Sequence, residues 1–220
     1  MTTLRHRLAT DTRYLLLSFP LAVISFSLIV AGVAAGLGSA VAFVGLPVLA
    51  ATAAMARNFA DVERVALPAV LGTPVARPDY REAPIGAGWF RRVMNPLTTG
   101  QAVMDLLYGI IAFPIAVAAF VVTVTWWAGA IAGLLFPLYG WMIADIQDVH
   151  GGLPSLLGLG DGPTVIVVFN TVVGLLFALT LVPVLRGAAL IKASIAQAML
   201  TRPVYAQRTM PAHTPGLGLS

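Results

Sequence analysis

The chain has no cysteine and very little charge. Without cysteine, neither a disulfide nor a thiolate metal site can form. Only 10% of the residues are charged while 59% are hydrophobic, a balance far outside that of soluble globular proteins. Charge is missing altogether from three runs, 14–56, 106–144 and 162–185. These runs predict a membrane protein, because a spanning helix needs about 20 apolar residues.

The constellations that carry out catalysis are also missing. Of the three histidines, His6 and His213 lie near the ends of the chain, so no Ser-His-Asp or metallohydrolase arrangement can be assembled. The glycine-rich stretch 32–38 is not followed by Gly-Lys-Ser/Thr, which excludes a phosphate-binding loop. We therefore predict no catalytic residue, no resident metal, no cofactor and no enzyme activity.

Two segments of the chain share one pattern of residues. The pattern Asp-x-x-Tyr-x-x-x-x-Phe-Pro-x-Ala-Val-x-x-Phe begins at Asp11 and again at Asp105. A Pro-Val-Leu sequence, at 47–49 and at 183–185, closes each copy. Apolar matches between hydrophobic runs arise easily, so the Asp, Tyr and Phe-Pro matches carry the argument. The recurrence predicts a duplicated membrane hairpin.

The basic residues predict which side of the membrane each loop faces. All 13 Lys and Arg fall within 5–13, 57–92 and 186–208, and the stretch 139–163 has none. Because basic residues stay on the cytoplasmic side of short loops, both termini are expected inside a multi-pass plasma-membrane protein, with 139–163 outside. The net charge of +4 is then a consequence of topology and does not indicate nucleic acid.

We predict an all-α integral membrane protein with four transmembrane helices in two kinked hairpins, related by a parallel pseudo-twofold axis. The first hairpin covers 14–56, and the second covers 106–185 with an extracellular insertion at about 129–163. Within that insertion, 128–144 is apolar but interrupted by glycine and proline, which favours either an interfacial or a re-entrant helix. One proline in each span is expected to kink it: Pro20, Pro47, Pro114 and Pro183.

Two amphipathic helices are expected in the cytoplasm. The first, 54–67, lies mostly in a cytoplasmic segment that covers 57–105, and it ends near Pro68 and Gly72. The second, 187–201, lies in the segment 186–201. Each has one apolar face at helical spacing, which predicts docking of a protein partner. The tail 202–220 is rich in proline and is expected to be disordered.

Aromatic residues and one amide are the candidate ligand or interface residues. The aromatic ones are Trp126, Trp127, Tyr139 and Trp141, expected at the outer interface, either as an ordinary aromatic belt or as a groove for a lipid or amphipathic molecule. Asn170 is expected to form hydrogen bonds between helices. The outer acidic residues Asp145, Asp148 and Asp161, with His150, fit a solvated loop better than a cation site.

Several stretches are similar to a known family. They are 14–26, Gly-Leu-Pro-Val-Leu at 45–49, Phe-Pro at 113–114, 122–129 with its Thr-Trp-Trp-Ala-Gly, 153–160 and Arg-Gly at 186–187. Over about 4–200 the chain resembles the "Putative sensor" domain, a multi-span input domain at the N-terminus of actinobacterial histidine kinases. In those kinases dimerisation and ATP-binding modules follow, and the printed sequence has neither. The resemblance implies an input module for envelope signalling, here as a stand-alone chain.

The leading hypothesis is a non-enzymatic membrane sensor or signalling accessory module. It would detect an envelope or lipid-like stimulus and relay it to a kinase, regulator or transporter subunit through helices 54–67 and 187–201. The alternative is a structural or accessory subunit of a larger membrane transport complex. Association of two copies into a homodimer is left open. The lipid bilayer is the other expected partner.

Overall fold

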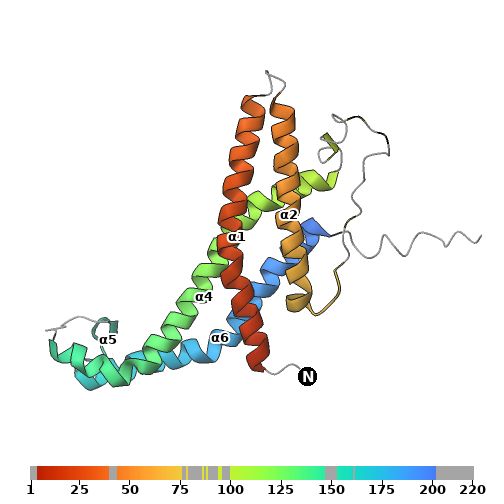
Figure 1. Cartoon of the computed structure of the whole chain (residues 1–220). Helices are drawn as coiled ribbons and strands as arrows, with labels where there is room; N and C mark the ends of the chain where they lie inside the picture. Colours follow the sequence, from red (N-terminus) through yellow and green to blue (C-terminus); the bar gives the residue numbers. More distant parts are fainter. Residues whose placement is uncertain are drawn as a thin grey trace, which may run out of the picture. The chain divides into compact units, whose positions relative to one another are not determined.

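The computed structural model describes residues 4–39, 44–75, 78, 86, 88, 94–95, 100–146, 153–160 and 162–201. Within these residues the chain forms helices and no strand. The long helices are α1 (Leu4–Gly38), α2 (Gly45–Leu71), α4 (Gly100–Ile146) and α6 (Pro163–Leu200), and α5 (Leu153–Leu156) is a single turn (Figure 1). The prediction of an all-α protein is confirmed for the part of the chain described.

Three of these helices, α1, α4 and α6, are long and apolar enough to cross a membrane. The chain is therefore a membrane protein. The 47 residues of α4 correspond to a length of about 70 Å, more than twice the roughly 30 Å of the hydrocarbon core. At a small tilt, only part of α4 can lie between the two interfaces.

The helices are longer than the elements that the sequence predicted. Residues 128–144 continue α4 and do not form a separate interfacial or re-entrant helix, so that expectation was wrong. Pro137 lies inside this stretch, and the helix passes through it. In the same way, the returning spans of the hairpins expected at 14–56 and 106–185 merge with the amphipathic helices that follow them, giving α2 and α6.

A glycine and a proline lie at the two ends of α2, and the structure shows the role of each. Gly72 caps the helix in the left-handed region, with φ 73°, and its N–H donates to the carbonyl of Pro68, as expected for a glycine C-cap. Pro47 lies in the first turn of α2, because the helix begins at Gly45. A proline there removes no intrahelical hydrogen bond, so the kink expected at Pro47 has no cause. The prolines at 20, 114 and 183 do lie inside α1, α4 and α6.

The chain divides into two compact units, and the divisions in α1 and α4 fall at the repeated Phe-Pro sequence. Unit 1 contains 1–20 and 114–192, and unit 2 contains 21–113 and 193–220. Thus α1 leaves unit 1 after Pro20, and α4 enters it at Pro114. These two prolines occupy the same position in the two copies of the pattern.

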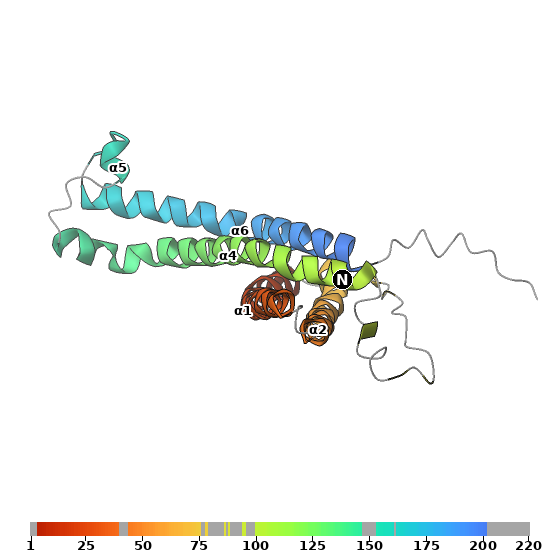
Figure 2. The same ribbon diagram turned by 90° about the horizontal axis from the view of Figure 1, so that it is seen from above.

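In unit 1, α4 and α6 lie side by side in antiparallel directions (Figure 2). Their closest approach is at Gly133 and Gly174, where a Cβ built on either glycine would collide with the backbone of the other helix. Such contact between backbones is possible only without side chains. In the same unit, Phe19 of α1 stacks on Phe120 of α4 with ring centroids 4.4 Å apart.

In unit 2, the second half of α1 packs against α2, and Figure 1 shows the two helices side by side. A Cβ on Gly32 would fall on Thr52, and one on Gly36 would fall on Leu49. The Gly-x-x-x-Gly pattern of α1 therefore serves close packing of helices and not a turn. Phe26 stacks on Phe113 at 4.6 Å. This stack and the one in unit 1 each join a Phe of one repeat copy to a Phe of the other.

Candidate functional site

The duplicated Asp-x-x-Tyr lies on one buried face in both copies. Residues three apart on a helix are neighbours, so each Asp and its Tyr point the same way. Asp11 is 4% exposed and Asp105 only 1%, and the tyrosines are also buried. A carboxylate that is out of contact with water needs a paired charge, and both copies provide one.

In the first copy, the charges come from α6. Arg186 donates to the carboxylate of Asp11 over 3.0 Å. One turn further along α1, the Lys192 ammonium donates to the Tyr14 hydroxyl over 3.0 Å and lies 4.2 Å from the centre of the ring. This second contact adds a cation–π attraction.

In the second copy, the charges come from α2. The Arg64 guanidinium donates to the carboxylate of Asp105 over 2.6 Å. Gln101, one turn earlier on α4, also donates to this carboxylate. One turn later, the Tyr108 hydroxyl is hydrogen-bonded to Glu63. In both copies the Asp pairs with an Arg, and the Tyr pairs with a second charged residue on the same helix as that Arg.

The difference between the two tyrosine contacts gives a testable prediction. Tyr108→Phe is expected to destabilise the protein by about 1–3 kcal/mol, because it removes a hydrogen bond from a buried carboxylate. Tyr14→Phe is expected to cost less, since Lys192 keeps its position over the ring. Thermal unfolding of the two variants in the same detergent measures the difference, and equal losses would contradict it.

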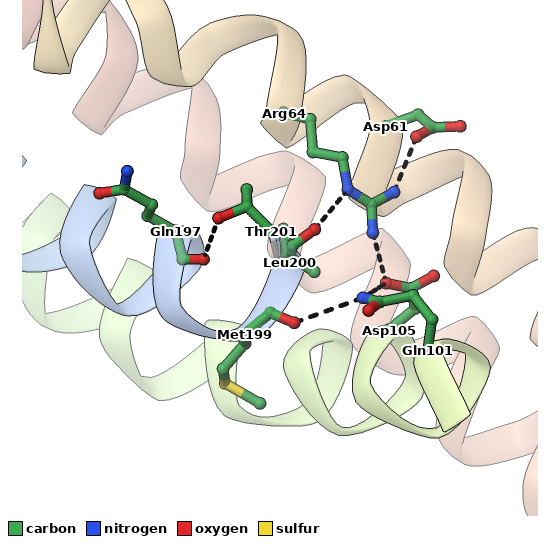
Figure 3. A network of polar contacts seen from close by, with 8 residues as sticks. All are labelled: Asp61, Arg64, Gln101, Asp105, Gln197, Met199, Leu200 and Thr201. Carbon is green, nitrogen blue, oxygen red and sulfur yellow. Dashed lines mark hydrogen bonds and ion pairs between the residues drawn. The ribbon is translucent and has the colours of Figure 1, made fainter. Parts of the chain in front are cut away.

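Arg64 also reaches the C-terminal end of α6 (Figure 3). Its Nε donates to the Leu200 carbonyl over 2.9 Å, and its third nitrogen donates to Asp61 over 2.7 Å. Gln101 donates to the neighbouring Met199 carbonyl over 3.4 Å. The Arg64 side chain is 1% exposed, and the carboxylate of Asp61 is 41% exposed. We call Arg64, Asp105 and Gln101 the α6 cluster.

The ion-paired groups are suited to holding helices together and not to catalysis. Carboxylates paired with guanidinium groups are poor bases, and no activated nucleophile is hydrogen-bonded to them among the described contacts. No group of His, Asp and Glu in the described part of the chain could hold a metal ion. The loop residues Asp148, His150 and Asp161, and the side chain of Asp145, lie outside the described residues.

The candidate aromatic residues are not brought together into one site. Trp126 donates to the Thr180 hydroxyl over 3.1 Å and meets Phe177 edge to face. Tyr139 donates to the Ala132 carbonyl in its own helix, and Trp141 is 64% exposed. Asn170 donates to the Ile166 carbonyl, one turn back in α6. This hydrogen bond lies within α6. It is not the bond between helices that was expected for Asn170.

The depth expected for the tryptophan pair does not fit the contacts in unit 1. The Trp127 indole N–H donates to the Thr12 hydroxyl over 3.3 Å. The sequence placed Thr12 at the cytoplasmic end of the first span and Trp127 at the outer end of the third. The stack of Phe19 on Phe120 follows the same order, so α1 runs past α4 in the opposite chain direction in this unit.

Apart from Asp11 and the two residues that follow it, the repeat and its charged partners lie within the region that matches a known family. A family model described as "Putative sensor" matches residues 14–200. The match covers most of the chain, including both Phe-Pro sequences and the α6 cluster. The chain belongs to this family. The resemblance inferred from the sequence is thereby confirmed, and the family assignment supports a sensing role. No curated protein and no solved structure matches this member of the Putative sensor family.

Sequence reasoning did not find the charged partners in this sensor-family chain. It singled out only the apolar face of the expected helix 54–67, as a surface for a partner. The structure leaves Met55 and Val62 of that face about half exposed and buries Glu63 and Arg64. The repeated Asp was the available signal. An acidic residue that recurs beside two apolar runs requires a counter-charge, and only a few basic residues lie near the ends of the runs.

Proposed function

We propose that the chain is a non-enzymatic membrane sensor that passes an envelope or lipid-like stimulus to a protein partner. The observation that carries the proposal is that α6 connects a membrane-spanning part to an end that is bound by other helices. α6 begins as an apolar helix suited to crossing the membrane, and its last turn is held by Arg64 and Gln101. A shift of the membrane part of α6 would therefore move the end of the same helix and alter its contacts with Arg64 and Gln101. The family assignment supports the same role.

The proposed topology is multi-pass, with both termini in the cytoplasm. It does not keep the parallel axis expected between the two hairpins, because α1 runs past α4 in the opposite chain direction in unit 1, and it does not keep a kink at Pro47. Its support is the distribution of Lys and Arg along the chain. The absence of cysteine makes a single-cysteine accessibility scan the direct test. Cysteines at Thr73 and Ala198 should be shielded from a membrane-impermeant thiol reagent in intact cells, and one at Leu157 should react. A reactive Ala198→Cys would overturn this topology. A series of single-cysteine variants along α4 would show which part of this helix lies within the membrane.

The proposed partner surface is the end of α6, within 187–201, together with the apolar side of α2. The partner would be a kinase, a regulator or a transporter subunit. Photocrosslinking from Ser194 and Ala198, which are exposed, tests the relay. We expect crosslinks to one partner whose yield changes at least about threefold under envelope stress. Crosslink yields that stay constant under every stress would argue against a sensor.

One observation favours the alternative function, a structural or accessory subunit of a membrane transport complex. On α2, Met55, Val62 and Val65 are 47%, 53% and 65% exposed while the charged Glu63 and Arg64 are buried. An exposed apolar strip of this kind also suits permanent docking. Purification in native membrane discs distinguishes the two functions: a subunit stays in a complex of fixed stoichiometry, and a sensor binds according to the stimulus.

A further inference from the structure

The arginines of the two copies of Asp-x-x-Tyr also differ in what they bind. In the first copy, Arg186 donates to the Asp11 carboxylate. In the second, Arg64 divides its donors between Asp105 and a main-chain carbonyl, that of Leu200. A guanidinium group presents N–H donors from separate nitrogens in a rigid fork and can bind both acceptors at once, whereas all the donors of a lysine lie on a single nitrogen. The second copy thus joins α2, α4 and the end of α6 through one side chain.

The end of α6 is where such a contact has the most effect. The last four carbonyls of a helix have no partner within the helix, and they carry the negative end of the helix dipole. Arg64 and Gln101 supply donors to two consecutive carbonyls, Leu200 and Met199. Thr201 donates to the Gln197 carbonyl, but without Arg64 and Gln101 the Leu200 and Met199 carbonyls would lose these donors and the last turn would fray.

We propose that the α6 cluster is a releasable latch, with Arg64 as the positioning residue, whose opening frees the last turn of α6 when the membrane part of the helix shifts. The inference rests on the proposed function and names the regulated step. The latch is sensitive to small movements, because N–H···O hydrogen bonds occupy a narrow range of about 2.7–3.2 Å. The contact from Gln101 to Met199 already measures 3.4 Å.

The test uses the purified full chain in nanodiscs of phosphatidylcholine with either short (myristoleoyl) or long (erucoyl) acyl chains. Changing the bilayer thickness forces spanning helices to tilt or shift, so it serves as the probe. Hydrogen exchange of the amides at 197–201 is followed by mass spectrometry. The variants are Arg64→Lys, which keeps the charge, and Asp61→Asn, a matched control that removes only the 41% exposed carboxylate bound to the same guanidinium.

In the wild type, exchange at 197–201 should differ by about threefold between the two bilayers. Asp61→Asn should behave like the wild type. Arg64→Lys should exchange about tenfold faster in both bilayers, because it loses a charged hydrogen bond to the helix end, and should show no further response to thickness.

Two results would overturn the latch. If Arg64→Lys exchanges like the wild type, Arg64 does not hold the end of α6. If it exchanges faster while the wild type does not respond to thickness, the contact is a fixed cap and not a latch. A different result would contradict the proposed sensing function, namely a yield of crosslinks from α6 that stays constant under every stress. Far-ultraviolet circular dichroism of each variant confirms that it is folded.

Discussion

Asp105→Asn is expected to lower the free energy of unfolding by about 3 kcal/mol, one of the two largest effects predicted for the chain. The substitution keeps the size of the side chain and one acceptor oxygen. It leaves the Arg64 charge, with its side chain 1% exposed, without its most buried counter-charge, and removing one partner of a buried ion pair typically costs several kcal/mol. Unfolding by dodecyl sulfate in mixed micelles measures the loss.

The matched control for Asp105→Asn is Asp61→Asn. Both substitutions remove a carboxylate that binds Arg64, but Asp61 is 41% exposed. Exposed ion pairs contribute between 0 and about 1 kcal/mol, so Asp61→Asn should be close to neutral. If the two variants lose the same stability, burial does not determine the strength of the α6 cluster.

Gly133→Leu is expected to destabilise the α4–α6 pair by about 3 kcal/mol or to prevent its formation. The side chain would have to occupy the space of the Gly174 backbone, and a backbone cannot move away as a flexible side chain can. Overpacking of a well-packed interface commonly costs about 1–3 kcal/mol, and contact with a backbone lies at the upper end. A disulfide yield between paired cysteines at Ala130 and Phe177 reports whether the two helices still meet.

Two further variants test this explanation. Gly174→Leu should produce the same loss, because the two glycines contact each other. Gly187→Ala, also in α6, should be neutral or slightly stabilising, since nothing lies within 4 Å of its Cβ position and alanine is the better helix former. A loss at Gly187 equal to that at Gly133 would show that the effect is not one of packing.

The sequence was sufficient for the class of fold and for the family. Long runs without charge predicted the helices α1, α4 and α6, and the Thr-Trp-Trp-Ala-Gly and Leu-Pro-x-Leu-Leu-Gly-Leu-Gly stretches carried the resemblance. Helix boundaries were less accurate. Glycine and proline at 128–144 suggested a break, but Pro137 lies inside a continuous helix. Proline lacks only one hydrogen bond, and the surrounding apolar residues favour continuation in a membrane.

The ion pairs could not be predicted from the pattern along the chain. Arg64 lies in a helix whose apolar residues follow a clear helical period, and that period indicated a face for a partner but not which residues pack inside the protein. The structure buries the opposite face, because Asp105 and the end of α6 require the Arg64 donors. Which face of an amphipathic helix is buried depends on its neighbours, and in a membrane protein apolar side chains do not mark the interior.

The first repeated aspartate pairs with an arginine of the last long helix, and the second pairs with an arginine of α2. This order has a consequence for biosynthesis. Asp11 is followed by its Arg186 partner 175 residues later, whereas Arg64 and Asp105 are 41 residues apart. At ordinary rates of translation, roughly 5–20 residues per second, the ribosome makes Arg186 about nine to thirty-five seconds after Asp11. During that interval the Asp11 carboxylate lacks this counter-charge, so it cannot take up its buried, paired position until α6 has been made.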